Sequence, residues 1–166
     1  MRELAARLGV SAMTPYRYFK DKDEILAAVR ARAFERFADR LEAALAEPGA
    51  AQEKGLAVVA AYVRFALEES QAYRLMFDLS QPGEDGFPEL AAASRRVRAT
   101  MTENVRLMVD AGIYEGDPVL IGHVMWAMLH GVAVLHLAGK LTGKPDFATL
   151  RDEALRAINR AYRKRN

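Results

Sequence analysis

The chain has 166 residues, which is long enough for one substantial hydrophobic core or for a small domain attached to a larger one. It contains no cysteine, which excludes disulfides, thiol catalysis and thiolate metal sites and is consistent with a cytoplasmic location. The net charge of +2 is nearly neutral, so partners must be inferred from local charge clusters. Residues 1–22, with five basic and two acidic side chains, suit contact with phosphates, whereas the basic residues 151–166 suit a solvated helix end.

A helix-turn-helix is predicted at the N-terminus, over the stretch RELAARLGVSAMTPYRYFKDKDEIL. Gly9 can end its first helix in a left-handed conformation, and Ser11 can cap the second helix by accepting from free N–H groups. Residues 12–19 form the expected second helix, which enters the major groove of DNA by its N-terminal end. Pro15 falls at the fourth position of that helix and forfeits one backbone hydrogen bond. Two aromatic side chains are expected to pack inward, Tyr18 and Phe19.

The rest of the chain has helical periodicity almost throughout and no convincing strand, which predicts an all-α fold. A long helix is expected from Asp21 to about Ala46, with Asp21 as its cap and Glu24 as the partner in a capping box. The breaker Glu47-Pro48-Gly49 follows it. The apolar side of this helix is expected to comprise Ile25, Val29, Phe34, Phe37 and Leu41.

Further helices are expected over residues 51–69, 71–79, 87–111, 118–141 and 147–164. The second of these five segments ends near the one clear loop, residues 81–88, which holds two prolines and two glycines. Asp117 and Asp146 are the expected N-caps of the last two helices. The apolar side of the first of the five is expected to comprise Val58, Tyr62, Phe65 and Leu67.

The N-terminal motifs LAARLGVS, TPYRYF and KDKDEIL resemble the helix-turn-helix of the tetracycline-repressor (TetR) family of transcriptional regulators. Tyr16, Phe19 and Lys22 fall where the family motif has two aromatics and a lysine. The run YRLMF resembles a helix often seen at this place in TetR-like ligand domains, and WAMLHG resembles a C-terminal ligand-domain variety of the family that contains WHG.

The resemblance implies a DNA-binding transcriptional regulator, expected to act as a homodimeric repressor on a palindromic double-stranded DNA operator. Tyr16, Thr14 and Lys22 are expected on phosphates or sugars, with Arg17 and Met13 nearest the base edges. A small apolar effector would shift the two recognition helices away from a separation of about 34 Å, one turn of DNA. The complete set of expected DNA contacts is Met13, Thr14, Tyr16, Arg17, Lys20 and Lys22.

Family members carry a further helix ahead of this motif, whereas Met1 stands directly on the segment that matches their second helix. We therefore expect either an incomplete chain or a misassigned start. The expected division is a DNA-binding region with its connecting helix over 1–46 and an effector-binding and dimerisation domain over 47–166. The alternative is a ligand-binding dimeric helical module that no longer binds DNA.

The signals for an enzyme or a metal site are weak. His123 and His130 stand seven residues apart, about 10 Å along a helix axis, which is too far for one metal ion. The sequence has no HExxH motif, no glycine-rich phosphate loop and no serine flanked as a nucleophile. We therefore expect no catalytic residue, no metal and no cofactor.

Methionines and aromatics from several helical segments are expected to converge on an adaptable apolar ligand cavity, although core packing is the simpler interpretation of any one of them. The resemblance of WAMLHG to a ligand domain favours Trp126 and His130 in particular. The expected effector-binding residues are Tyr62, Phe65, Met76, Phe77, Met101, Val105, Met108, Trp126 and His130.

The uncharged stretch 119–139 is long enough to span a membrane, but three histidines interrupt it and a helix that is apolar all round can equally be buried. We therefore expect no membrane partner. Small residues at helical spacing allow another helix to approach closely, which favours a four-helix bundle between two copies of the chain. The expected dimer contacts are Ala127, Gly131, Val134, Ala138, Leu155 and Ile158.

Overall fold

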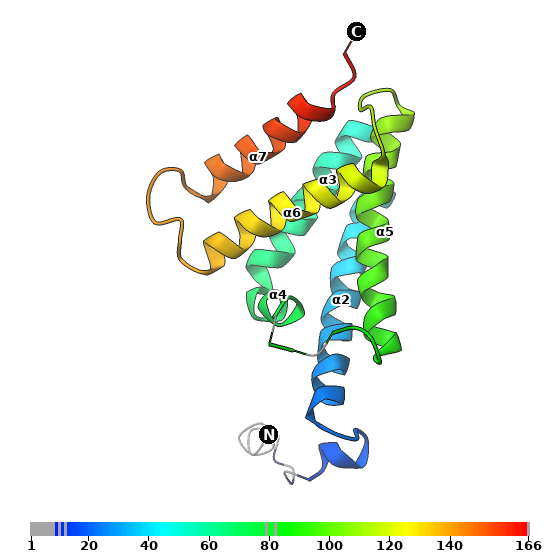
Figure 1. The fold of residues 1–166 in the computed structure, drawn as a ribbon, viewed down its shortest axis with the longest axis vertical. Helices are drawn as coiled ribbons and strands as arrows, with labels where there is room; N and C mark the ends of the chain where they lie inside the picture. The colour runs from blue at the N-terminus through cyan, green and yellow to red at the C-terminus, as the bar shows by residue number, and fades with distance from the viewer. Residues whose placement is uncertain (1–8, 10, 12, 79, 82, 166) are drawn as a thin grey trace.

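The computed structural model describes residues 9, 11, 13–78, 80, 81 and 83–165, and every structural statement below concerns those residues. They form an all-α fold, as predicted (Figure 1). The one β-type pairing among them is an isolated bridge between Tyr114 and Arg163. The elements are η1 (Pro15–Arg17), α2 (Lys22–Ala46), α3 (Ala51–Glu68), α4 (Ser70–Met76), α5 (Pro88–Asp110), α6 (Pro118–Leu137) and α7 (Phe147–Tyr162).

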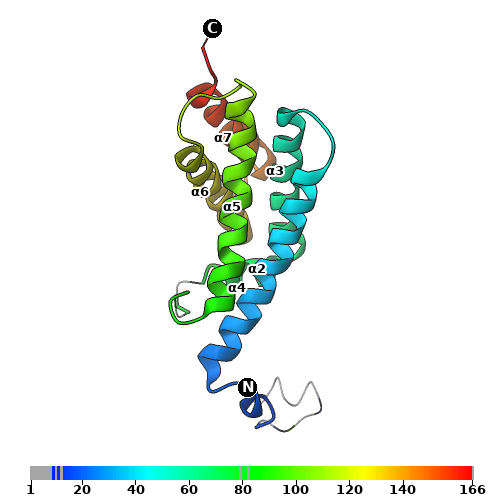
Figure 2. The same ribbon diagram turned by 90° about the vertical axis from the view of Figure 1, so that its right-hand side faces the viewer.

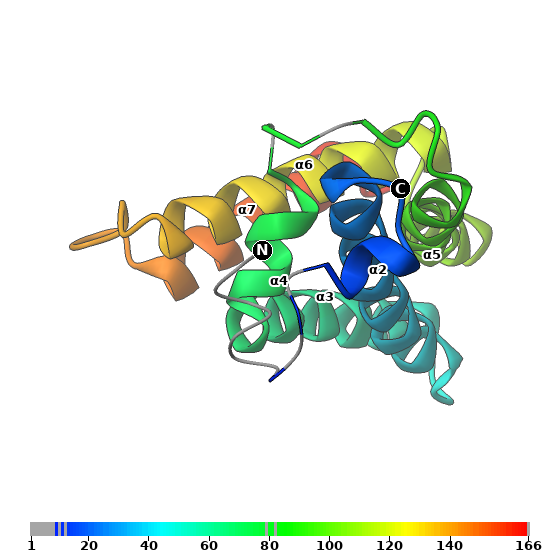
Figure 3. The same ribbon diagram turned by 90° about the horizontal axis from the view of Figure 1, so that it is seen from below.

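The long helices α2 and α5 lie side by side along the long axis of the molecule, and α3 packs against both (Figure 2). Seen along that axis, α6 and α7 lie on one side and α3 on the other, with the short α4 between them (Figure 3). The core lies where α2, α3 and α5 meet, around the fully buried Phe37, Tyr62 and Val105. Residues 13–21 extend from the N-terminal end of α2, away from this core (Figure 1).

The N-terminus of α2 has the predicted cap. The side chain of Asp21 accepts a hydrogen bond from the Glu24 N–H (2.9 Å), which satisfies a donor that has no partner within the helix. The Glu24 carboxylate instead accepts from the backbone N–H of Lys20, so the expected reciprocal bond to Asp21 is replaced by one a residue earlier. The prediction for Val29 was wrong, because this side chain is 48% exposed on a flank of α2 that the described residues leave uncovered.

Two predictions for α3 and α4 need correction. Leu67 is 36% exposed and does not belong to the buried side of α3. The helix expected to reach residue 79 ends at Met76, because the chain turns at Asp78, whose carboxylate accepts from the Ser80 N–H at 2.9 Å. This turn holds Phe77 close to the end of α4.

The helix α6 begins as predicted, with Pro118 at its first position and the Asp117 side chain accepting from the Val119 N–H (3.0 Å). It ends at Leu137 rather than at residue 141. Gly139 takes a left-handed conformation there (φ +66°), which allows its N–H to donate to the His136 oxygen and closes the helix.

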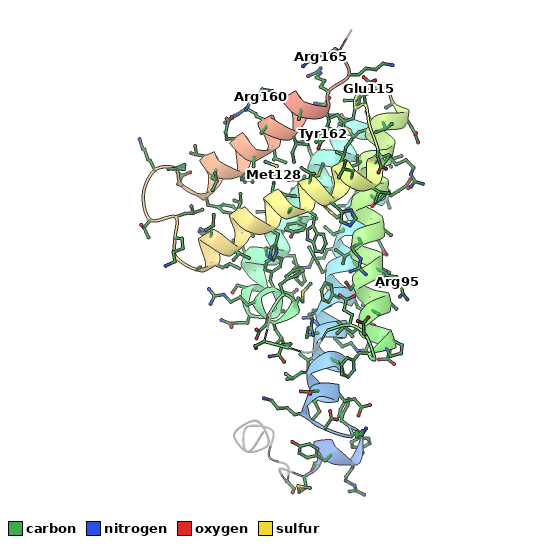
Figure 4. All side chains as sticks on the ribbon, viewed as in Figure 1. Arg95, Glu115, Met128, Arg160, Tyr162 and Arg165 are labelled. Atoms are coloured by element: carbon green, nitrogen blue, oxygen red, sulfur yellow. The ribbon has the colours of Figure 1, made fainter. Side chains whose placement is uncertain are left out.

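The helix α7 also begins at its predicted cap, Asp146, whose side chain accepts from the Thr149 N–H (2.8 Å). It ends at Tyr162, two residues earlier than expected, because the following backbone pairs with residues 113–115. Glu115 N–H donates to the Tyr162 oxygen (2.8 Å), at the end of the molecule where both residues are labelled in Figure 4. These contacts attach the C-terminal segment to the loop before α6.

Within the described residues, α6 is the one helix whose length and composition would allow it to cross a membrane. Its most apolar window is 33% buried inside the chain. Core helices of soluble proteins meet the same criterion, so this helix is weak support for a membrane span. It is better described as a helix with one face against α5 and another available for contact.

Candidate functional site

The expected recognition helix over residues 12–19 is reduced in the structure to the single 3₁₀ turn η1. Its backbone bonds have three-residue spacing: Thr14 N–H donates to the Ser11 oxygen (2.9 Å) and Arg17 N–H to the Thr14 oxygen (3.2 Å). Pro15 explains this correction, since it has no N–H to donate and disfavours helical geometry at the residue before it. The Ser11 hydroxyl accepts from the Met13 N–H at 3.3 Å, but this bond closes a turn ahead of η1 and does not cap a helix as predicted, because η1 begins only at Pro15.

Most of the side chains expected to contact DNA are exposed at this end of the molecule. Met13 is 67% exposed and Tyr16 37%, and Arg17, Lys20 and Lys22 are exposed as well. Thr14 is half-buried. Residues 13–23 therefore expose three cations and two tyrosines, together with two aspartates, and the cations are of the kind that contacts a phosphate backbone.

Other predictions for the head have mixed outcomes. Gly9 adopts the left-handed conformation expected at the turn (φ +65°). Phe19 is half-buried, but Tyr18 is 79% exposed and is not packed inward as expected. The first helix of the motif, at residues 1–8, lies outside the described residues.

Six of the nine residues expected to bind an effector belong to the closely packed core. Each is at most 6% exposed, and all contribute to one continuous apolar cluster. This burial agrees with core packing, the simpler interpretation of these residues in the sequence. These side chains therefore chiefly stabilise the fold. The six are Tyr62, Phe65, Met76, Met101, Val105 and Met108.

The other three predicted residues lie at or beside an open groove. The groove lies between α4 and the C-terminal half of α6 and encloses about 420 Å³. Phe77 and His130 line it, and Trp126 lies beside it with its ring centroid 6.1 Å from that of Phe77. The complete lining is Tyr73, Arg74, Phe77, His130, Val134, Leu137 and Ala138.

Sequence reasoning missed Tyr73, Arg74 and Leu137 as groove residues. A signal for the first was present, because Tyr73 and Phe77 stand four apart in YRLMF and therefore share one face of a helix. The opposing wall comes from residues 130–138, nearly 60 positions further along the chain. That pairing depends on the tertiary fold.

Three polar side chains form a hydrogen-bonded chain from the core to the groove. The Tyr62 and Tyr73 hydroxyl oxygens are 2.7 Å apart, and the Tyr73 hydroxyl lies 2.8 Å from Nδ1 of His130. Burial raises the pKa of both tyrosine hydroxyls and lowers the pKa of His130. All three groups are therefore held in their neutral forms.

The ring of Phe77 meets the His130 ring edge to face, with centroids 4.5 Å apart. The histidine is thus held by one hydrogen bond and by ring contacts with Phe77 and Tyr73, while it also forms part of the groove wall. A side chain held in this way can orient a ligand without first losing its own rotational freedom.

One side of α6 carries apolar and small side chains that the described residues leave uncovered. Ala127, Val134 and Ala138 are exposed, and Gly131 is half-buried with open space where a Cβ would lie. Leu155 of α7 is half-buried against the core. The prediction that Ile158 contacts a second chain is not supported, because Ile158 is 2% exposed and packs inside its own chain.

Comparisons with known proteins point to one family. Residues 55–158 match the family model described as the tetracyclin repressor-like C-terminal domain, and residues 1–29 match the model for bacterial regulatory proteins of the tetR family. No curated protein matches the chain significantly.

Solved structures with the same fold cover nearly the whole chain. A Rhodococcus protein of unknown function is 28% identical (TM-score 0.80; 98% of this chain and 84% of that chain covered). The TetR family transcriptional regulator PfmR from Thermus thermophilus is 22% identical (TM-score 0.73; 96% and 86%). A Rhodococcus bacterial regulatory protein in the tetR family is 20% identical (TM-score 0.69; 96% and 82%).

Proposed function

Because this chain belongs to the TetR family of DNA-binding transcriptional regulators, we propose that it is a repressor that a small apolar effector releases from a palindromic operator. The match of residues 1–29 to the N-terminal family model favours this function over that of a ligand-binding module without DNA binding. Operator contacts are assigned to Met13, Thr14, Tyr16, Arg17, Lys20 and Lys22. The protein would act in the cytoplasm, where operator DNA is accessible.

The observation that carries the proposal is the position of α4 between the groove and the helix that bears the head. Tyr73 and Phe77, at and just beyond this short helix, line the groove. The backbone oxygen of Met76 accepts a hydrogen bond from Nη2 of Arg30 in α2 (3.3 Å). A ligand that displaces α4 therefore acts directly on α2.

Effector action follows from the relative affinities of two conformations. An effector lowers operator affinity if it binds more tightly to the conformation in which α2 holds the two heads at the wrong separation. The operator then lowers effector affinity by the same factor. The groove suits such an effector, since its volume lies in the usual range for small-molecule sites and its walls are mostly apolar.

Dimerisation is a property of the family, and we assign it here to α6 and α7. The exposed Ala127, Val134 and Ala138, together with Gly131, provide a surface that another helix can approach closely. A two-fold dimer places two heads on two half-sites, which is why we propose a palindromic operator. Val134 and Ala138 also line the groove, so ligand binding and subunit packing would affect one another.

The test begins with an operator selected from random duplexes by the purified protein. Fluorescence anisotropy of the labelled operator then reports DNA release, and the single tryptophan, Trp126, reports ligand binding near the groove. We expect apolar small molecules that change Trp126 fluorescence saturably to release the operator over the same concentration range. A reporter gene behind the operator should be expressed more strongly in their presence.

Two outcomes would contradict the proposal. If the protein enriches no duplex sequence, it does not act as a sequence-specific regulator. If ligands that saturate Trp126 leave operator affinity unchanged, the groove is not the regulatory site. Substituting His130→Ala provides the matched variant, because it alters the groove while leaving the exposed head residues intact.

A further inference from the structure

The hydrogen-bonded chain from Tyr62 through Tyr73 to His130 has a preferred direction. Each tyrosine hydroxyl carries a single hydrogen, so the chain runs either toward His130 or away from it. If it ran away from His130, the Tyr62 hydrogen would need an acceptor beyond Tyr73. Tyr62 is fully buried and has no such acceptor among the described residues.

The nearby side chain of Trp126 cannot supply that acceptor, because an indole N–H only donates. The opposite direction pairs both tyrosine hydrogens: Tyr62 donates to Tyr73, and Tyr73 donates to Nδ1 of His130. Nδ1 is then an acceptor, which places the ring hydrogen of the neutral imidazole on Nε2. Within the described residues Nε2 has no hydrogen-bond partner.

The residues that line the groove carry positive charge and no negative charge. Its seven lining residues include the guanidinium of Arg74 and no aspartate or glutamate. Arg74 is exposed and donates one N–H to the backbone oxygen of Leu137, which leaves other donors of its fork available. The remaining wall is mostly hydrocarbon, from Phe77, Val134, Leu137 and Ala138.

From these two donors and the apolar wall we propose that the groove binds a small apolar carboxylic acid in its ionised form. The carboxylate would accept from Nε2 of His130 and from Arg74, and its hydrocarbon body would lie on Phe77 and Leu137. This assignment rests on the proposed function, because it specifies the chemical class of the effector at the same site. Tyr73 has a positioning role, since its hydroxyl fixes which nitrogen of His130 donates.

The experiment compares decanoate, decanol and decylamine, which share an apolar body and differ in the polar group. Binding to the wild-type protein is measured by isothermal titration below the concentrations at which these molecules aggregate. We expect one decanoate per chain, decanol weaker by about tenfold, and no saturable binding of decylamine.

Matched variants locate the site. Arg74→Gln and His130→Leu should each weaken decanoate by about tenfold and leave decanol binding unchanged. His130→Gln, which retains an N–H donor, should restore part of the loss. Arg95→Gln is the control, because Arg95 is exposed on the outer side of α5, away from α4 and α6 (Figure 4).

The positioning role of Tyr73 has its own readout. In Tyr73→Phe the imidazole is free to move its hydrogen to Nδ1, so the preference for decanoate over decanol should decrease while decanol binding persists. Nitrogen NMR of labelled histidine should show the Nε2–H form of His130 in the wild-type protein and a mixture of the two neutral forms in the variant.

The proposal is overturned if none of the three probes binds, if decanol or decylamine binds as tightly as decanoate, or if Arg74→Gln behaves like Arg95→Gln. Operator release separates this inference from the proposed function. Decanoate that binds at Arg74 without releasing operator DNA would support the carboxylate site and contradict effector control. If only a neutral or cationic molecule released the operator, effector control would be supported and the carboxylate site contradicted.

Discussion

The Nη2 atom of Arg30 lies 3.3 Å from the backbone oxygen of Met76, which connects the helix that carries the head to the last residue of α4. Arg30 is only 7% exposed, so this contact is shielded from water. A buried carbonyl that loses its donor is costly to leave unpaired. The contact therefore makes the end of α4 and the position of α2 mutually dependent.

Replacing Arg30 with methionine should separate ligand binding from DNA release. The variant Arg30→Met keeps an apolar stem of similar reach but removes the donor, so ligand affinity should change little. The coupling between effector and operator should decrease, by about 1–3 kcal/mol if this contact carries most of it. Operator affinity measured with and without saturating effector gives the coupling directly.

The control for this variant is Arg36→Met, since Arg36 also extends from α2 and bonds to Glu69 (3.0 Å) but is half exposed. Surface ion pairs contribute little, so the control should retain normal coupling. If the coupling between effector and operator were the same in Arg30→Met as in Arg36→Met, the signal would reach α2 by another route.

Two head residues should affect DNA binding differently. Lys22→Ala removes an exposed cation at the start of α2, and it should weaken binding to all duplexes equally and reduce the salt slope by about one unit. Arg17→Ala should instead reduce discrimination between operator and random DNA, by about 1–3 kcal/mol if Arg17 contacts a base. Anisotropy titrations at several salt concentrations measure both effects, and wild-type behaviour in both variants would contradict the assignment of this surface.

Much of the fold was predictable because its determinants are local. Asp21, Asp117 and Asp146 each cap a helix within three residues of themselves, so the caps could be identified without tertiary information. Gly139 closes α6 for an equally local reason, but its role is visible only once its left-handed conformation is known, and the helix was therefore predicted too long.

The candidate site was less predictable, because a buried residue and a cavity-lining residue have the same periodicity. Met101 and Val105 repeat at helical spacing, and only the closeness of the opposing helices identifies them as core. Conversely, Arg74 looks like a surface residue in the sequence, and its place in the groove depends on α6 crossing above it. Helix packing decides both cases.

Substitutions at two glycines of α6 should affect different properties, the oligomeric state in one case and the thermal stability in the other. A Cβ at Gly131 would meet open space within the chain, whereas a Cβ at Gly122 would lie 3.4 Å from the Met101 oxygen and the Thr102 Cα atom. Gly131→Glu should therefore fold, because Glu is the better helix former, but it should be monomeric since the charge would be buried in the proposed dimer contact. Gly122→Val should lower the melting temperature instead.

Sedimentation velocity and thermal unfolding of the two variants check this pair of predictions. The assignment of the dimer to this face of α6 would be wrong if Gly131→Glu remained a dimer with wild-type affinity. A melting temperature of Gly122→Val equal to that of the wild-type protein would contradict the close crossing of α5 and α6.

The stability of the protein should depend on pH through His130. Burial lowers the pKa of His130 from its ordinary value of 6.5, so the unfolded chain takes up a proton first as the pH falls. The free energy of unfolding should therefore decrease as the pH falls through 6.5 and should level off below the lowered pKa of the folded state. Because His130 is partly exposed, the slope should remain below the one-proton limit of about 1.4 kcal/mol per pH unit.

Urea unfolding of the wild-type protein and of His130→Gln between about pH 7.5 and about pH 5.5 isolates this contribution. The pKa values of Asp78, Asp146 and Glu153 are also lowered, by the hydrogen bonds that these carboxylates accept, but their ordinary values of 3.8 to 4.5 put that effect at lower pH. The wild-type protein should lose more stability than the variant over this interval. If the two pH profiles run parallel, His130 is not held neutral by burial, and the direction assigned to the Tyr62–Tyr73–His130 chain loses its support.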